Sequence, residues 1–198
     1  MPPLAESLIV VSGLPRSGTS LVMQMLAAAD IGMVTDKSRG ADEDNPRGYF
    51  EFERVKTLQT DSKWLWEARG KAVKIVAPLL VALPPGLACR VIFCERSLDE
   101  VLDSQERMRL RRQLPAATPA RQRMLKAEYL RTLGRVKTML RLRPATQLLV
   151  VEHGAAISEP LATARGISDF LGSGLDVAKM AAIVEPALHR NRAHCGKR

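Results

Sequence analysis

Residues 8–20 read Leu8-Ile-Val-Val-Ser-Gly-Leu-Pro-Arg-Ser-Gly-Thr-Ser20. The apolar run from Leu8 to Val11 is typical of a buried strand, and residues 20–29 have the apolar spacing of a helix. The loop between them contains two glycines and ends where the predicted helix begins. Unpaired N–H groups at a helix N-terminus carry partial positive charge, so such a loop binds anions whatever its side chains are. The stretch therefore predicts a strand–loop–helix unit with an anion site.

The loop has the glycine spacing of the nucleotide-binding P-loop, G-x-x-x-x-G-K-[ST], with Gly13 and Gly18 at the two glycine positions. Thr19 stands where that pattern has its lysine, and the cation comes three residues earlier, as Arg16. A guanidinium offers a planar fork of donors that suits phosphate or sulfate oxygens. The loop therefore favours a phosphate or sulfate ligand that is not held in the manner of ATP.

Strands and helices alternate along the rest of the chain. The predicted strands cover 73–77, 90–94 and 147–151, and the predicted helices cover 53–68, 97–112, 121–142, 167–171 and 177–184. Ser97 and Glu100 fit a capping box at the start of one of these helices. Alternating strands and helices predict a parallel sheet. We expect an α/β fold, a three-layer P-loop-type parallel sheet with helices on both faces, formed by residues 1–198 as a single domain.

The composition, with 46% apolar and 26% charged residues, is that of an ordinary globular protein. No apolar run is long enough for a membrane span, and the N-terminus lacks the basic residues of a secretory signal. Cys89, Cys94 and Cys195 lack the spacing of metal ligands, and an odd number of cysteines is a poor disulfide framework. We expect reduced thiols, a cytoplasmic location and no metal site.

The net charge of +9 is concentrated in residues 106–145, where 12 basic and 2 acidic residues occur. Such a field could attract a polyanionic donor or an acidic acceptor, although a solvated helix face is the commonest reason for a basic run. Nucleic-acid binding is not favoured, because aromatic residues make up only 4% of the chain and Tyr129 alone lies in this segment.

Residues 13–20, Gly13-Leu-Pro-Arg-Ser-Gly-Thr-Ser20, resemble the 5′-phosphosulfate loop of sulfotransferases that use 3′-phosphoadenosine 5′-phosphosulfate (PAPS), which commonly reads P-[RK]-S-G-T-[ST]. In that family, an arginine at the end of a strand and a serine further on in the next helix bind the donor's 3′-phosphate. Arg96 and Ser104 stand at the family's interval. Arg96 would leave the sheet at its carboxyl edge, where open α/β sheets bind ligands. The chain is therefore similar to PAPS-dependent sulfotransferases of the small bacterial type.

Three further segments extend the resemblance from Gly13 to Arg192, nearly the whole chain. Residues 42–51 resemble the family's N-P-x-G-Y-[FY]-E segment, residues 74–78 its K-x-x-x-P strand, and residues 185–192 its basic C-terminal segment. Two features of the family are missing. The residues after the strand 90–94 lack the common R-D-P, and no G-x-x-G-x-W loop follows the C-terminal segment.

The resemblance implies that PAPS is a co-substrate and that its sulfuryl group moves to a hydroxyl or amine. The acceptor would be a small molecule, a carbohydrate or a peptide, with an acidic acceptor as one option, and no metal would be required. Arg16 and Lys74 are the implied partners of the charge that develops on the bridging oxygen. The implied donor-binding residues are Pro15, Arg16, Ser17, Gly18, Thr19, Ser20, Arg96, Ser104, Arg190 and Arg192.

We expect the general base to lie in the segment that follows the first helix. Many sulfotransferases use a histidine, and several bacterial and Golgi types use a glutamate after the first helix. The three histidines of this chain all lie at or beyond residue 153, so Glu51 is our candidate, with Glu43 and Glu53 as close competitors.

Two other function classes stay open at this point. A P-loop kinase of nucleotides or small molecules would need a strand-end carboxylate for Mg²⁺, for which Glu95 or Glu152 could be argued. A non-catalytic protein that binds nucleotides or nucleic acid would instead use the basic segment 106–145.

Overall fold

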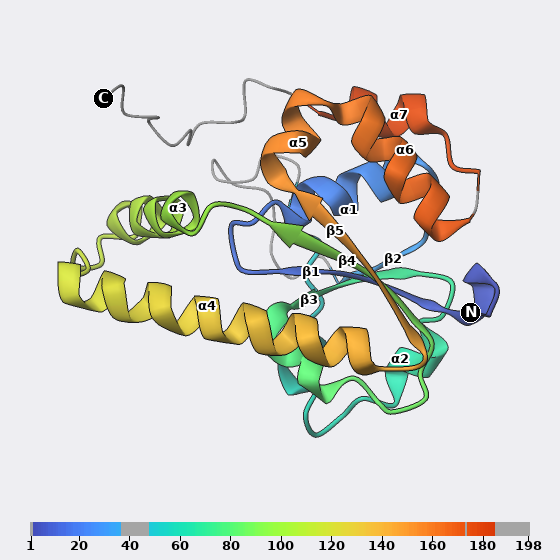
Figure 1. Cartoon of the computed structure of the whole chain (residues 1–198), viewed down its shortest axis with the longest axis horizontal. Coiled ribbons are helices and arrows are strands. Elements are labelled where there is room, and N and C mark those ends of the chain that lie inside the picture. Colours follow the sequence, from blue (N-terminus) through green and yellow to red (C-terminus); the bar gives the residue numbers. More distant parts are fainter. Residues whose placement is uncertain (1, 37–47, 173, 185–198) are drawn as a thin grey trace.

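The computed structural model describes residues 2–36, 48–172 and 174–184. At its centre lies a five-stranded sheet with the order β2-β3-β1-β4-β5, in which every pair of neighbours is parallel (Figure 1). The strands are β1 (Leu8–Gly13), β2 (Met33–Val34), β3 (Ala72–Val76), β4 (Cys89–Glu95) and β5 (Thr146–Glu152). All six residues of β1 are buried, as expected for a central strand covered on both sides. The predicted α/β class and parallel sheet are confirmed.

One face of the sheet is covered by α1 (Thr19–Ala28), α5 (His153–Ser158), α6 (Pro160–Leu171) and α7 (Val177–Ala182) (Figure 1). Ile9 and Val11 of β1 point to this face and pack in one cluster with Met25 of α1 and Ile167 of α6. Side chains alternate along a strand, so one strand contributes to two separate cores.

The other face is covered by α2 (Trp64–Glu67), the 3-10 turns η2 (Glu53–Thr57) and η3 (Ala77–Ala82), and α4 (Pro119–Leu142). Leu8 and Val10 of β1 pack here with Val136 and Leu140 of α4. The sheet between these two helical layers confirms the three-layer arrangement. A further 3-10 turn, η1 (Leu4–Glu6), precedes β1.

The α4 helix and α3 (Leu98–Arg111) extend together from the carboxyl edge of the sheet (Figure 1). Only the C-terminal half of α4 reaches the sheet, where its buried residues lie. The helix begins earlier than predicted, at Pro119, because proline suits the first helical position and the Thr118 hydroxyl accepts a 3.2 Å hydrogen bond from the Arg121 N–H.

The predicted helix over 53–68 is wrong. It is divided into η2 and α2 by the polar turn at residues 58–63, in which the Asp61 N–H bonds to the Thr57 carbonyl at 2.9 Å. The Trp64 indole donates a hydrogen bond to the Asp61 carbonyl at 3.1 Å, and α2 begins at Trp64. Turn-forming polar side chains bond to nearby backbone groups and compete with the helix.

The predicted capping box is also wrong. Ser97 precedes α3 at the N-cap position, but its side chain makes no capping bond, and Glu100 forms an ion pair with Arg96. The two-residue strand β2 and the short helix α5 were not predicted, because both are too short to show a periodic pattern.

Candidate active site

The loop between β1 and α1 depends on both of its glycines. A Cβ on Gly13 would lie 2.3 Å from Ser17 Oγ and 2.6 Å from the Cys94 carbonyl oxygen. Gly18 is the N-cap of α1 at φ +99°, a conformation that other residues rarely adopt. The Ser17 N–H bonds to the Leu14 carbonyl at 3.1 Å and closes a turn, so it is engaged within the loop and not offered to an anion. The N–H groups of residues 19 and 20 open α1, where no preceding turn supplies an acceptor.

Arg16 stands at the tip of this loop with a φ of +78°, which is strained for a residue with a side chain. Its Nε donates a 2.9 Å hydrogen bond to the hydroxyl of Ser104, which is buried in α3. The predicted phosphosulfate residue and the predicted 3′-phosphate serine therefore contact each other directly.

Arg96 directly follows β4, as predicted, and only 8% of its side chain is exposed. Its Nη1 donates to the backbone carbonyl of Arg16 at 3.2 Å, and its Nε donates to the Glu100 carboxylate at 2.7 Å. Arg96 thus fixes the backbone of the loop tip while its charge is shared with a carboxylate. Arg16, Arg96 and Ser104 form one connected group.

Lys74 approaches the loop from β3. Its Nζ donates to the Ser20 hydroxyl at 3.3 Å and to the Tyr49 carbonyl at 2.9 Å, and it lies 5.7 Å from the centre of the Tyr49 ring. The ammonium therefore sits at the first turn of α1, where it adds to the positive potential of the helix N-terminus. It also anchors the segment that leads to Glu51.

The structure describes two of the three candidate bases, Glu51 and Glu53. Glu51 follows the anchored Tyr49, and its carbonyl accepts hydrogen bonds from the Thr35 hydroxyl at 2.9 Å and the Asp36 N–H at 3.4 Å. The Glu53 side chain is 60% exposed and pairs with Lys56 at 2.8 Å, which leaves it directed to solvent. Glu43 lies outside the described residues.

Sequence reasoning missed His153 as a neighbour of the loop. It begins α5 directly after β5, and its Cδ2 atom lies 2.6 Å from the place that a Cβ on Gly18 would take. The place of Gln147–Val151 as a strand could have indicated this, because the carboxyl ends of parallel strands meet at one edge. Gly13 pairs with Cys94, and Glu95 pairs with Glu152, so the loop and His153 share that edge.

The remaining predicted residues fall into two groups. Glu95, one of the two carboxylates that a kinase could use for Mg²⁺, forms a 2.5 Å ion pair with Lys137 of α4. Its negative charge is therefore paired within the protein. Arg190 and Arg192 lie outside the described residues.

The part of the chain that the structure describes contains no group of three or more His, Cys, Asp or Glu side chains placed to hold a metal ion. Within the same residues, no helix is both long and apolar enough to cross a membrane.

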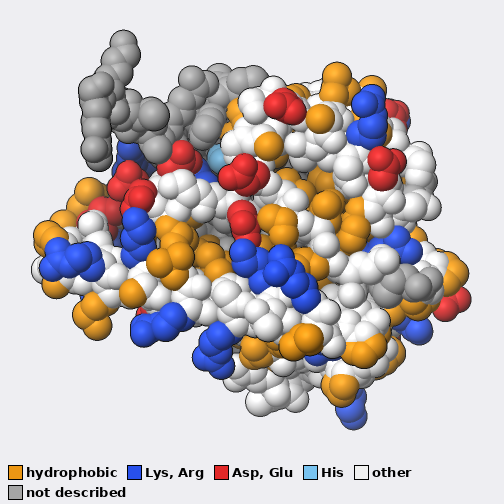
Figure 2. Space-filling view, viewed as in Figure 1, with side chains coloured by type: hydrophobic (Ala, Val, Ile, Leu, Met, Phe, Trp, Pro, Cys, Tyr) orange, Lys and Arg blue, Asp and Glu red, His pale blue; other side chains and the backbone are white. Residues whose placement is uncertain are grey.

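Several basic side chains of the segment 106–145 are engaged in ion pairs and hydrogen bonds. Figure 2 shows basic side chains spread over the surface, with hydrophobic side chains between them. Lys126 pairs with Asp99 at 2.5 Å, Lys137 with Glu95, and Arg143 donates to the carbonyls of Leu83 and Pro84 at 3.1 and 2.6 Å. Part of the basic excess is therefore used in packing α4.

No family model matches the chain, and no curated protein matches it by sequence. Solved structures do resemble it. A sulfotransferase domain from the Synechococcus PCC 7002 olefin synthase matches with a TM-score of 0.55 and 15% identity over 94% of this chain and 87% of that one. A sulfotransferase domain of the curacin biosynthetic pathway matches with a TM-score of 0.51 and 15% identity over 90% and 77%. A Mycobacterium avium sulfotransferase matches with a TM-score of 0.54 and 15% identity over 92% and 67%. The five parallel strands, the loop after β1 and these likenesses together show that the chain has a sulfotransferase-type fold.

Proposed function

We propose that the protein is a PAPS-dependent sulfotransferase that moves a sulfuryl group to a hydroxyl or amine. The observation that carries the proposal is the contact of Arg16 with Ser104, together with the contact of Arg96 with the Arg16 backbone. Two matches to the family that lie far apart in sequence meet in one place. A site that must bind both ends of one donor needs that proximity.

The loop is proposed to hold the 5′-phosphosulfate. The N–H groups of Thr19 and Ser20 open α1, the Lys74 ammonium lies at the Ser20 hydroxyl, and Arg16 stands at the tip of the same loop. Hydrogen bonds from charged donors to anionic oxygens are about twice as strong as neutral ones. Pro15, Ser17 and Gly18 shape this loop and complete the proposed donor contacts.

Arg96 and Ser104 are proposed to bind the 3′-phosphate. The Arg96 guanidinium has one nitrogen on Glu100 and one on the Arg16 carbonyl, which orients the group rigidly. A phosphate arriving there competes with the Glu100 carboxylate for the same cation. Arg190 and Arg192 of the C-terminal segment are proposed as further contacts on the grounds of the sequence alone.

The chemistry needs a base for the acceptor and stabilisation of the leaving group. Glu51 is proposed to take the proton from the acceptor hydroxyl or amine, and Arg16 and Lys74 to stabilise negative charge on the bridging oxygen. Fixed cations perform this task without a metal ion, so none is proposed. His153 is the second candidate for the base, because it contacts the loop.

Nothing in the site favours a nucleic-acid partner, and the acceptor is proposed to be a small molecule, a carbohydrate or a peptide. The cytoplasm is the proposed compartment. Cys89 and Cys94 are both unpaired and buried, which suits a reducing environment.

The test is a comparison of donors. Calorimetry is expected to show saturable binding of 3′-phosphoadenosine 5′-phosphate in EDTA, together with sulfuryl transfer from PAPS to at least one member of an alcohol, amine and saccharide panel. Tight binding of Mg²⁺–ATP with no binding of the bisphosphate would favour a kinase. Salt-sensitive affinity for DNA or RNA, with neither nucleotide bound, would favour the nucleic-acid alternative.

A further inference from the structure

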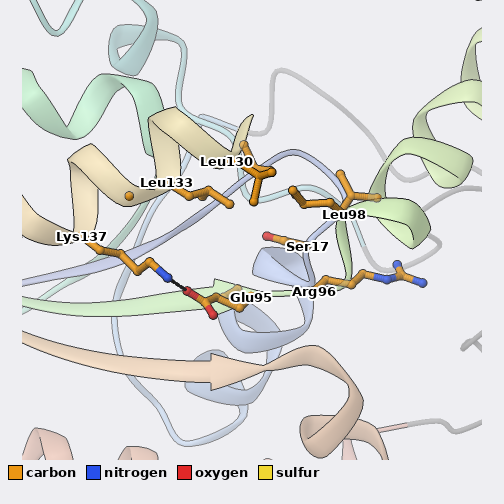
Figure 3. A pocket seen from close by; sticks show the side chains of 11 residues that line it. Ser17, Glu95, Arg96, Leu98, Leu130, Leu133 and Lys137 are labelled. Atoms are coloured by element: carbon orange, nitrogen blue, oxygen red, sulfur yellow. Dashed lines mark hydrogen bonds and ion pairs between the residues drawn. The ribbon is translucent and has the colours of Figure 1, made fainter. Parts of the chain in front are cut away.

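A cavity of about 290 Å³ lies behind the loop, between the carboxyl end of β4, the first turns of α3 and the middle of α4 (Figure 3). Five of its lining side chains are aliphatic: Leu14, Leu98, Val101, Leu130 and Leu133. Figure 3 shows that the Arg96 guanidinium points away from this space, whereas Glu95 faces it. The Arg96 guanidinium, part of the proposed donor site, is therefore directed out of the cavity, while Ser17 and Arg96 both belong to the cavity wall.

The cavity opens to solvent through α4. Leu130 lies at its rim and is 58% exposed. Gly134, one turn further along α4, leaves part of the wall without a side chain, and a Cβ built there would meet no described atom within 4 Å. An opening of this kind allows a ligand to enter without separation of the helices.

The polar groups of the cavity favour an uncharged ligand with a hydrogen-bonding group. Glu95 and Lys137 neutralise each other at 2.5 Å, so a charged ligand would lose its hydration without gaining an opposite charge. The Ser17 hydroxyl is buried and makes no hydrogen bond within the described residues. Figure 3 shows its oxygen turned toward the leucines of α4. A buried hydroxyl without a partner is destabilising, and a ligand hydroxyl would satisfy it.

We propose that this cavity is a binding site for a small uncharged molecule with an apolar body and one hydroxyl group. Since a water molecule takes about 30 Å³ in the liquid, the cavity holds roughly ten waters, and hence a ligand of about ten non-hydrogen atoms. One aromatic ring with a short alkyl chain has that size. Its body would contact the leucines, and its hydroxyl would bond to Ser17.

The site matters to the loop because Leu14 and Ser17 belong to it. An occupant would contact both residues that flank Pro15 and Arg16, and would stiffen the loop. Binding to the cavity does not rest on the proposed sulfuryl transfer, so the two can be tested separately.

The probe is 4-propylphenol, titrated by calorimetry into the wild-type chain and two variants. Gly134→Leu places a side chain in the opening, and Gly166→Leu makes the same change in α6, where there is also open space. Both substitutions favour the helix and should preserve the thermal unfolding transition. We expect a dissociation constant on the order of 0.1–1 mM for the wild type. Gly134→Leu should weaken binding at least about tenfold, and Gly166→Leu should leave it unchanged.

A charged probe of similar size, 4-ethylbenzoate, should bind about tenfold or more weakly than 4-propylphenol. Failure of 4-propylphenol to saturate the wild type would overturn the proposal, as would equal binding by the wild type and Gly134→Leu, or equal loss in both glycine variants. Incubation with PAPS then separates two sources of the ligand. Formation of 4-propylphenyl sulfate would identify an acceptor, and binding without product would identify a ligand that does not react.

Discussion

Arg16 and Ser104 lie 88 residues apart, and the Nε of the arginine donates a 2.9 Å hydrogen bond to the hydroxyl of the serine. One residue belongs to the loop after β1, and the other is buried in α3. The contact ties the proposed sulfuryl-transfer loop to the proposed 3′-phosphate site. A donor phosphate that binds to the Ser104 hydroxyl would therefore compete with Arg16 for that hydroxyl. We expect binding at the proposed 3′-phosphate site to affect the contacts of Arg16 in the loop.

The first prediction concerns the charge of Arg16. Arg16→Ala should lower the rate of sulfuryl transfer by roughly 10²–10³-fold, because a donor aimed at developing charge acts mainly in the transition state. Steady-state kinetics with PAPS measures this loss. Arg123→Ala, at an exposed position of α4, is the matched control and should retain wild-type kinetics. Full activity in Arg16→Ala would remove this residue from the mechanism.

The second prediction concerns the backbone at the same position. The backbone of Arg16 has a φ of +78°, which glycine adopts without strain and alanine does not. Arg16→Gly and Arg16→Ala both remove the same side-chain contacts, so they differ in this backbone strain. The glycine variant should therefore have the higher free energy of unfolding, by about 0.5–1 kcal/mol. Urea denaturation of the two variants gives the comparison. Equal stabilities would mean that the loop relaxes when the side chain is removed.

The third prediction concerns the clamp at Arg96. Arg96→Ala should weaken binding of 3′-phosphoadenosine 5′-phosphate by about 1.5–3 kcal/mol, and Ser104→Ala by less, since one contact is charged and the other is not. Both should reduce discrimination against the analogue that lacks the 3′-phosphate. Calorimetry with both nucleotides decides the matter, and unchanged discrimination in both variants would contradict the assignment.

Glu100 gives the clamp a sharper test. Its carboxylate bonds to Arg96 at 2.7 Å and repels a phosphate that approaches the same cation. Glu100→Gln should tighten binding of the bisphosphate several-fold, by roughly the amount expected for one partly screened charge. Asp99→Asn, at the exposed neighbour that pairs with Lys126, should have no such effect. Weaker binding in Glu100→Gln would show that the carboxylate orients Arg96 and does not compete for it.

The fourth prediction separates the candidate bases. Glu51→Gln keeps the shape and removes the basicity, so turnover should fall about 10²-fold while donor affinity stays within a few-fold. Glu53→Gln should have wild-type turnover, because that side chain pairs with Lys56 at the surface. If both variants keep their turnover and His153→Gln loses it, the histidine at the start of α5 is the base. Glu43→Gln completes the series.

The fifth prediction concerns pH and the thiol of Cys94. Burial raises its pKa from 9.0 to about 12, so the folded chain keeps a proton that the unfolded chain releases near pH 9. The unfolded state then binds fewer protons, and the free energy of unfolding falls as pH rises from 9 toward 12, by up to about 1.4 kcal/mol per pH unit for this group. Cys94→Ala should reduce that slope in urea titrations between pH 8 and about 11. An unchanged slope would mean that the thiol does not stay protonated in the folded state.

The sequence by itself determined the elements whose patterns are local. The apolar runs that became β1, β3, β4 and β5 are short and rich in apolar residues, as is typical of strands in a parallel sheet, although β3 contains Lys74 and the edge strand β5 is only partly buried. The loop could also be predicted from the sequence, because the requirement for its two glycines is local. A side chain on Gly13 would collide with Ser17 and the neighbouring strand, and Gly18 has a positive φ. Arg96 could be placed at a strand end because it closely follows the apolar run of β4.

Only the tertiary structure decided which side chains meet. The bond between Arg16 and Ser104, the bond from Arg96 to the Arg16 carbonyl and the proximity of His153 to Gly18 depend on strand order, which no local pattern encodes. The cavity behind the loop arises in the same way, since its walls come from β4, α3 and α4. Periodicity reports how a segment is buried, whereas the identity of its neighbours is set by how separate segments pack together.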